Sequence, residues 1–515
     1  MRIFHSSSPE AAAAPSHVQL GYPTELARNR GFAAILGMAL AITAVPYGMG
    51  SALTSAALYG GGQLSMVVGL LVVVVLDGCV AASLAELASR FPTSSGVYYW
   101  SYRLLLPNDK PTGASSSSAA AAPLAYITGW FWLIGNWTIA LSVNFGFASL
   151  VAATVCIYQP SFSSASAWQL LLIFYALCLL TFIICSLGDS LLPYVDRIAA
   201  VWNLLTIVVV LVVVAATARS GRHTAATALG HYDPSFSGWG PGFAFFIGLL
   251  PPAYTFCAIG MVTSMAEECE DPETQVPRAM TLCMPLGGVA ALVFVLPLCF
   301  TLPPQADLLA APYGQALPYI LTRVVGGGGA GAVAVMALVF GVALFCSVSI
   351  TTTASRCTWA FARDAGIPGS RLWARTAAGQ PLPALALVTV VQMLLGLINL
   401  GSTSAFTAFV SVGVIGLAVG YLVPIVISLA TRRREVATAR WRLSPAIGIA
   451  VNVVAVLWIV FELVLFSMPQ ALPVTPASMN YASVVFVGFS VISAGWYCVA
   501  GRRNFKGPPE ETRIN

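Results

Sequence analysis

The chain has 515 residues, of which 58% are hydrophobic and only 8% are charged, and its formal net charge is +5. An ordinary soluble domain has about 25% charged residues, so these few charges cannot cover the surface of a water-soluble enzyme. The composition also excludes a disordered chain, and the small net charge leaves no basic face for nucleic acid. The chain is therefore expected to be a multi-pass integral membrane protein whose surroundings are the lipid bilayer.

The charged residues are confined to short stretches between long uncharged windows. No Asp, Glu, Lys or Arg occurs between Gly31 and Leu76, or between Pro111 and Gly188. A helix needs about 20 apolar residues to cross a bilayer, whereas the strands of a membrane barrel alternate over shorter segments. The windows predict an all-α fold with twelve transmembrane helices, at 31–56, 64–88, 124–155, 169–188, 191–216, 242–265, 278–301, 331–361, 382–400, 404–430, 444–467 and 480–500.

Lysine and arginine positions orient these spans. With the N-terminus in the cytoplasm, all but three of the 24 lysines and arginines fall on the cytoplasmic side, the exceptions being Arg219, Arg222 and Arg323. This bias is the one that the positive-inside rule describes. We expect cytoplasmic tails at 1–30 and 501–515, and a low-complexity linker rich in Ser, Ala and Pro at 111–123.

No motif in the sequence indicates a cofactor or a metal. The 11 cysteines lie mostly inside apolar stretches without paired spacing, which is typical of small buried side chains rather than of a disulfide framework or a zinc site. The phosphate-binding pattern GxxxxGK[ST] is absent from the sequence. Any work that the chain does across the membrane would therefore draw its energy from a gradient.

Helix-breaking residues crowd the middle of the first and sixth spans. They are Pro46, Gly48 and Gly50 in the first, and Pro251, Pro252 and Gly260 in the sixth. Proline removes a backbone donor and glycine lowers helix stability, so each span is either kinked but continuous or unwound into two half-helices. Unwound spans would offer half-helix ends and free carbonyls for a substrate site at the membrane midplane.

The two interrupted spans are five helices apart. This is the spacing of an inverted repeat of five helices, which places breaks at corresponding positions in both halves. We therefore expect a first repeat at 31–216, a second repeat at 242–430 and two appended helices at 444–500.

Four segments, in the same order and topological places, carry a resemblance to a known family. They are ELASRFPTSSGVYYW at 86–100, SMAEECEDPETQVPRAM at 264–280, FARDAGIPGSRLW at 361–373 and LPVTPASMNYASVV at 472–485. Together they resemble the amino acid/choline transporter group of fungal permeases in the amino acid–polyamine–organocation superfamily.

The resemblance implies the leucine-transporter-type fold and a secondary active transporter rather than an enzyme. The group includes permeases for GABA, other amino acids, choline and polyamines. The coupling ion is expected to be a proton rather than sodium. The plasma membrane is the first expected location, and the vacuole or another internal membrane is the second. Many relatives have an Asp where this chain has Gly260, and the choline-permease type has a His where it has Ser264. Neutral or zwitterionic amino acids, including GABA, therefore rank ahead of choline and polyamines.

The candidates for substrate contact are aromatic residues, a threonine, a proline and glycines at the two breaks. One polar residue from each of the third and eighth spans could complete the pocket. An aromatic residue in a membrane helix otherwise serves packing, and a polar one can join helices. The candidate substrate-binding residues are Pro46, Tyr47, Gly48, Gly50, Asn136, Tyr254, Thr255, Phe256, Gly260 and Ser347.

Ionisable residues inside a bilayer are costly and therefore suggest function. Asp77, in the middle of the second span, is the best candidate for a proton carrier, whereas Glu462 lies outside the repeat, where a structural role is possible. Asp196 and Arg197 could simply pair. Ser349 belongs to a polar run at 347–355, which would either hold a coupling ion, as hydroxyls of this span do in sodium-coupled members of the fold, or allow close helix packing.

Charged residues near the cytoplasmic ends of the spans could form a gate. The alternative is that they are plain solvated charges, or, for Glu86, an anchor for the inner loop. The candidates are Glu86, Glu267, Glu268, Arg278, Arg363 and Asp364.

Two other classes of function compete with transport. A channel would need a continuous polar pore with rings of charge, which the sequence does not show. A substrate-sensing receptor on the same fold would bind without flux, but such receptors often have longer cytosolic extensions than these tails.

The predicted orientation can be tested by labelling single cysteines from outside intact cells. Reagent should reach cysteines placed in the 217–240 and 302–330 loops, and it should miss those in 89–123, 362–381 and 431–442. External labelling of the arginine-rich 431–442 segment would reverse the orientation.

Overall fold

Twelve helices of the computed structural model are long and apolar enough to cross a membrane, which confirms the predicted all-α fold and number of spans. The structure describes residues 20–106, 116–164, 166–188, 191–218, 222–326, 329–377, 379–401, 403–476 and 478–509. Within these ranges the only β-structure consists of two isolated bridges.

The spans follow the chain in order, and several are made of more than one helix. Spans one to six are α2 (Phe32–Thr43) with α3 (Val45–Ser51), α5 (Gln63–Arg90), α7 (Ser116–Val155), α8 (Ala167–Ser186), α9 (Leu192–Thr217), and α11 (Pro241–Ile247) with α12 (Leu250–Phe256) and the 3₁₀ segment η3 (Cys257–Glu268). Spans seven to twelve are α13 (Pro272–Thr301), α16 (Ala330–Arg363), α18 (Leu382–Gly396) with α19 (Ile398–Gly401), α20 (Thr403–Ala430), α21 (Pro445–Leu465), and α22 (Ala482–Trp496) with the turn η7 (Tyr497–Gly501) and α23 (Arg502–Asn504).

Short helices lie in the connections between spans. They are α4 (Leu53–Leu58), α6 (Val97–Leu105), η1 (Pro160–Ser164), α10 (Ala225–Gly230), η2 (Ser235–Ser237), α14 (Gln305–Leu309), η4 (Pro312–Gly314), α15 (Ala316–Val325), α17 (Ser370–Trp373) and η6 (Val436–Thr438).

The expectation of a linker at 111–123 is wrong for the second part of that segment. The helix α7 already begins at Ser116 and contains Pro123 near its start. Four alanines precede this proline, and alanine has the strongest intrinsic helix preference, so the third span extends beyond its apolar window. Residues 111–115 lie outside the described residues, as do 1–19 of the N-terminal tail and 510–515 of the C-terminal tail.

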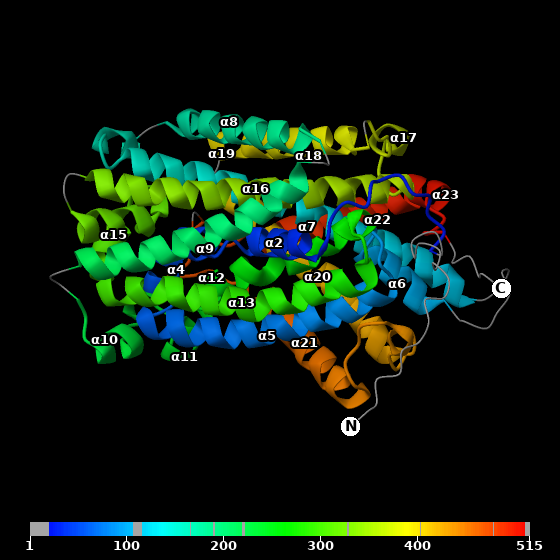
Figure 1. Ribbon diagram of the computed structural model, residues 1–515, viewed down its shortest axis with the longest axis horizontal. Coiled ribbons are helices and arrows are strands. Elements are labelled where there is room, and N and C mark those ends of the chain that lie inside the picture. The colour runs from blue at the N-terminus through cyan, green and yellow to red at the C-terminus, as the bar shows by residue number, and fades with distance from the viewer. Residues whose placement is uncertain are drawn as a thin grey trace, which may run out of the picture.

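The spans run side by side, and the described chain begins and ends at the same end of the bundle. This end, at the right of Figure 1, holds α6 and α23, and we call it the tail end. The opposite end, at the left, holds α10 and α15, and we call it the loop end. An even number of spans requires both ends of the chain to lie on one side, as they do.

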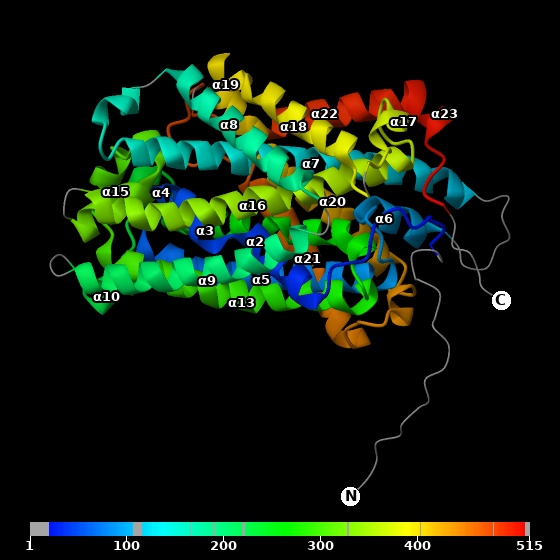
Figure 2. The same cartoon turned by 45° about the horizontal axis from the view of Figure 1, so that its top comes forward.

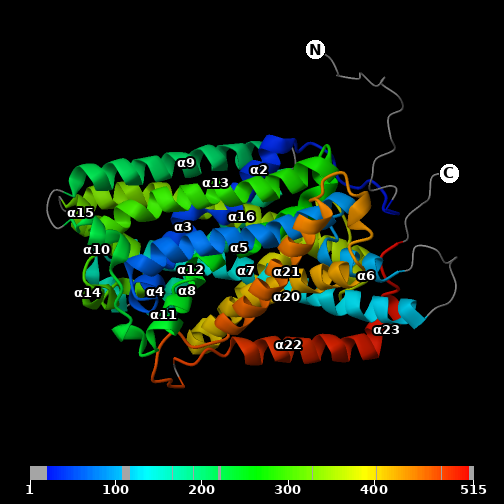
Figure 3. The same cartoon turned by 90° about the horizontal axis from the view of Figure 1, so that it is seen from below.

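The first and sixth spans lie inside the bundle. Figures 1 and 2 show α2 between α13 and α16, which it contacts, and α3 contacts α12. In both broken spans 78% of the most apolar window is buried, against 11% in the last span. Figure 3 shows α22 of that last span along one edge of the bundle. The broken spans are therefore core elements, whereas α22 presents its valines to lipid.

Candidate functional site

The first span breaks at Ala44. This residue adopts the left-handed conformation, with φ of 39°, between the end of α2 and the start of α3. Alanine pays roughly 1–2 kcal/mol for such a conformation, so the surrounding packing must hold it. Pro46 lies in the first turn of α3, where its missing N–H group costs nothing. Thus Pro46, Gly48 and Gly50 all belong to α3. The interruption lies at Ala44, a few residues before the middle of the span that these residues indicated.

The sixth span changes its helix type at Phe256. The α-helix α12 ends there, and the chain continues for 12 residues as the 3₁₀ segment η3. Runs of 3₁₀ helix longer than about four residues are uncommon and often mark a hinge. As in the first span, the prolines Pro251 and Pro252 lie at the start of a half-helix. Both spans are thus interrupted, and the alternative of two kinked but continuous α-helices does not apply.

A small cavity separates the two breaks. Its volume is about 20 Å³, which is room for a single water molecule but not for a substrate. We call it the break cavity. It is lined by Ile42, Thr43, Ala44, Tyr47, Gly48, Ile139, Val143, Tyr254, Thr255, Cys257, Ala258, Cys346 and Ile350.

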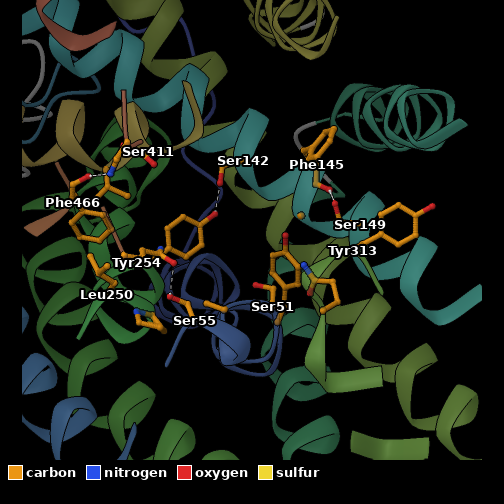
Figure 4. Close-up of a pocket in the computed structure, with 18 of the residues that line it drawn as sticks. Ser51, Ser55, Ser142, Phe145, Ser149, Leu250, Tyr254, Tyr313, Ser411 and Phe466 are labelled. Atoms are coloured by element: carbon orange, nitrogen blue, oxygen red, sulfur yellow. Dashed lines mark hydrogen bonds between the residues drawn. The ribbon is translucent and has the colours of Figure 1, made fainter. Parts of the chain in front are cut away.

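A larger cavity of about 620 Å³ adjoins the break cavity, and Tyr47 and Tyr254 line both. We call it the vestibule, because it extends from the breaks to connecting segments at the loop end, where Tyr313 and Gln315 line it. Small-molecule sites commonly enclose about 300–1,000 Å³, so the vestibule has the size of a binding site. Figure 4 shows the side chains that surround it.

Hydroxyl groups and aromatic rings dominate the vestibule. The Tyr254 hydroxyl lies 2.6 Å from Ser142 Oγ, and the Tyr47 hydroxyl donates to the Val143 carbonyl at 2.6 Å. These contacts join each broken span to α7. Further lining side chains include Ser51, Ser55, Phe145, Ser149, Asn399, Ser411, Phe466, Gln470 and Asn480. None of the described side chains that line this cavity is an Asp, Glu, Lys or Arg.

Of the ten substrate-site candidates, Tyr47 and Tyr254 line both cavities, Gly48 and Thr255 line the break cavity, and the others line neither. Gly260 does not face the substrate cavities, because a Cβ atom there would lie 2.4 Å from the Tyr421 ring on α20. Gly50 packs against Leu317 in the same way, with a Cβ at 2.7 Å. These two glycines therefore permit close helix packing rather than substrate contact in this state.

The remaining candidates also make their contacts outside the break cavity and the vestibule. Asn136 donates to the Trp132 carbonyl at 2.7 Å, and Ser347 donates to the Ala343 carbonyl at 2.9 Å, so both bond within their own helix. Pro46 is buried in α3 without lining either cavity. Phe256 faces a third cavity.

Buried charges form ion pairs at the tail end. Glu268, at the end of η3, accepts from Arg30 Nε at 2.9 Å and from Arg356 Nε at 2.7 Å. Arg30 also pairs with Asp196 on α9. All four side chains are at most 3% exposed, and we call them the ion cluster. It connects the segment before the first span with spans five, six and eight.

A second group of contacts lies beside the ion cluster. Glu267 makes two bonds with Arg363, each 2.9 Å long, and accepts from Thr93 Oγ1 and the Ser94 N–H group at 3.0 Å. The Arg363 guanidinium lies 3.8 Å from the ring centre of Tyr22. These contacts fasten the N-terminal segment and the loop after α5 to spans six and eight.

Asp364 follows α16 and completes this group. It accepts from the Tyr22 and Tyr98 hydroxyls at 2.8 and 2.7 Å. Burial raises the pKa of the Asp364 carboxyl, and the neighbouring Arg363 charge and the two hydroxyl donors oppose this rise.

Two of the predicted gate residues lie apart from these contacts. Glu86 pairs with Arg433 and accepts from the Leu443 N–H group at 2.8 Å, so it anchors the segment between α20 and α21. Arg278 is exposed on α13 and makes no ion pair within the described part of the chain. The other four candidates, Glu267, Glu268, Arg363 and Asp364, belong to the contacts at the tail end.

Sequence reasoning missed several members of the ion cluster. Asp196 pairs with Arg30 and not with its neighbour Arg197, because adjacent helical residues point in different directions. Arg356 could have indicated a buried ion pair from the sequence, since it is a lone charge among the last turns of a long apolar span. Ser349, a candidate for ion coupling, donates to Asp196 at 3.5 Å and so contacts this cluster.

Comparison with known proteins agrees with this architecture. The sequence model of the family described as amino acid permease matches residues 34–489. The chain belongs to this family. It is 30% identical to the amino-acid permease BAT1 homolog of Oryza sativa subsp. japonica over 95% of this chain and 94% of that protein. The choline transporter of Saccharomyces cerevisiae is 28% identical, over 92% of this chain and 81% of its own. The polyamine transporter TPO5 of the same yeast is 27% identical, over 92% and 75%.

This family consists of transporters and not of enzymes, and the chain is accordingly an amino acid, polyamine or choline permease-type transporter. Its twelve spans make it a multi-pass integral membrane protein.

Replacing Glu268 by Gln should open the tail end. The change leaves two buried guanidinium groups without their shared carboxylate, and breaking such a pair costs about 3–5 kcal/mol. A cysteine introduced at the buried Ser94, in a background without other reactive cysteines, should then react faster with a membrane-impermeant thiol reagent applied at the tail end.

The matched control is Glu273→Gln. Glu273 is 3.5 Å from the well-exposed Arg440, and an exposed pair contributes only about 0–1 kcal/mol. An unchanged Ser94→Cys reaction rate in Glu268→Gln would show that the ion cluster does not hold this end closed.

Proposed function

We propose that the chain is a secondary active transporter of an amino acid or a related small amine such as GABA, and that it works by proton symport with alternating access. The vestibule carries this proposal. It has the volume of a small-molecule site and it ends at two helix breaks. Its described lining includes hydroxyl, amide and aromatic groups beside aliphatic ones such as Leu250 and Val414, and none of these side chains is ionised. A net-neutral zwitterion can enter such a cavity without leaving a buried charge uncompensated.

The two ends of a zwitterion would be bound by different groups. A carboxylate would lie at N–H groups freed where a span is interrupted, near the positive end of a half-helix. An ammonium group would contact backbone carbonyls at the breaks and the faces of Tyr47 and Tyr254. Because the break cavity holds only about 20 Å³, substrate binding would require the half-helices to move apart.

The closed tail end and the vestibule at the loop end would together form one state of the transport cycle. If the N-terminus is cytoplasmic, this state faces outward and the ion cluster is the cytoplasmic gate. Spans one, two, six and seven would rock against a scaffold of spans three to five and eight to ten, which belong to repeats at 31–216 and 242–430. The plasma membrane is the first expected location, and the vacuole or another internal membrane is the second.

Choline is the second candidate substrate, because the vestibule is rich in aromatic side chains. Tyr47, Phe145, Tyr254 and Phe466 all line it, and aromatic faces bind quaternary ammonium groups. A polyamine ranks lower, since its several positive charges would find no described carboxylate in this cavity.

Uptake into proteoliposomes tests the proposal. The panel contains labelled GABA, neutral and basic amino acids, choline and putrescine, each with an imposed pH gradient, with and without sodium. We expect accumulation of a neutral or zwitterionic compound that needs the pH gradient and not sodium. Binding without any uptake would instead identify a substrate-sensing receptor, and uptake of choline alone would favour the second candidate.

The hydroxyl pair at the breaks should matter for affinity. Tyr254→Phe leaves Ser142 without its partner and removes one polar group from the cavity wall, which should weaken substrate binding roughly tenfold, as expected for about 1.4 kcal/mol. The control is Tyr313→Phe, which removes a hydroxyl near the loop end of the same vestibule. Equal affinities of Tyr254→Phe and the wild type would place the substrate elsewhere.

A further inference from the structure

Two buried carboxylates face the third cavity, which residues of α5, α12, η3, α20 and α21 line. Asp77 on α5 and Glu462 on α21 both line it, and they are only 4% and 5% exposed. Its volume is about 10 Å³, and most of its other lining side chains are apolar, among them Val80, Phe256 and Ile459. We call it the carboxylate cavity.

Within the residues that the structure describes, neither carboxylate has hydrogen-bond partners for both of its oxygen atoms. Asp77 Oδ1 accepts from the Trp458 indole N–H group at 2.7 Å, but Asp77 Oδ2 and Glu462 Oε1 have no hydrogen-bond partner among the described residues. Trp458 and Glu462 are four residues apart on α21 and so lie on one face of that helix. One turn of α21 therefore presents both a donor and a second carboxylate to Asp77.

No cation faces this pair within the described part of the chain. The other titratable groups around it are Cys79 beside Asp77, Cys257 on η3 and Tyr421 on α20, all of which are neutral in their ordinary state. Two like charges in one apolar cavity cannot both stay ionised, so such a pair retains at least one proton. Hard metal cations such as Mg²⁺ take about six oxygen ligands, which this small cavity does not offer.

We propose that Asp77 and Glu462 form a paired-carboxylate site that binds and releases the proton coupled to transport. The pair alternates between one bound proton, with a charge of minus one, and two bound protons, with no charge. Loading adds a proton from the acidic side to the free carboxylate, and release returns it on the other side. This proposal rests on the proton coupling of the proposed function and adds Glu462, Trp458 and the cavity to Asp77.

The position of the pair explains how its charge could affect substrate binding. Cys257, the first residue of η3, lines both the carboxylate cavity and the break cavity, and its carbonyl accepts from the Tyr421 hydroxyl at 3.1 Å. Val414 on α20 lines both the carboxylate cavity and the vestibule. A change of charge at the pair therefore acts directly on the hinge of the sixth span.

The first test compares transport by Asp77→Asn, Glu462→Gln and the wild type in proteoliposomes. Each substitution keeps the side-chain size and removes one titrating group. We expect both variants to lose accumulation driven by a pH gradient while they still exchange labelled for unlabelled substrate across the membrane. Asp307→Asn, which removes an exposed carboxylate at the loop end, is the control and should accumulate substrate as the wild type does.

A milder variant tests the role of Trp458. Trp458→Phe removes the only hydrogen-bond donor to the Asp77 side chain among the described residues. Because this donor stabilises the ionised carboxylate, the midpoint of the pH dependence of transport should move to higher pH. A purely structural role of the indole would lower the rate without moving this midpoint.

The second test reads the protons directly, without transport. Infrared difference spectra of the purified full chain, between acidic and alkaline pH, should contain a protonated-carboxyl band that is lost in Asp77→Asn and in Glu462→Gln. If the wild type is driven by protons but Glu462→Gln accumulates substrate normally, or if the band survives in both variants, the paired site is wrong while the proposed function stands. If the wild type is driven by sodium or does not transport, proton coupling in the proposed function is wrong, and the infrared band still decides whether the pair binds protons.

Discussion

The structure depends on one buried carboxylate, Glu268, held between the guanidinium groups of Arg30 and Arg356. Removing charges from water is expensive, and breaking such a pair is strongly unfavourable, so these side chains must stay together as long as the tail end is closed. The Arg30 N–H group also donates to the Glu268 carbonyl at 3.1 Å, which fixes the segment before the first span to the end of the sixth. Both broken spans are therefore tied at this end, and the vestibule extends toward the other.

Proline marks the start of one half-helix in each broken span. In each span proline occupies the first turn of a half-helix, where its missing donor is harmless, and the interruption lies beside that half-helix. The first interruption, at Ala44, precedes α3, whereas the sixth span changes to 3₁₀ geometry after α12. Cys257 then lies where the break cavity meets the carboxylate cavity. The same element would thus sense substrate on one side and a proton on the other.

The sequence predicted the features that depend on local composition and missed those that depend on tertiary contact. Uncharged windows revealed all twelve spans, and the crowding of Pro and Gly identified the two broken ones. The exact break positions could not be read from Gly50 or Gly260, because a glycine that permits a turn and one that permits close packing look alike in a sequence. Gly260 serves the second purpose against Tyr421. Asp77 and Glu462 appeared as isolated charges because their elements are far apart along the chain, and only the fold brings them to one cavity.

Alternating access is the central claim, and paired distance measurements test it most directly. Spin labels at the exposed positions Gln159 and Leu309 report the loop end, and labels at Ala27 and Arg371 report the tail end. With substrate at acidic pH, the distance across the loop end should shorten while the distance across the tail end lengthens. Distances that stay constant at both ends, or that widen together, would contradict a transporter that opens one end at a time.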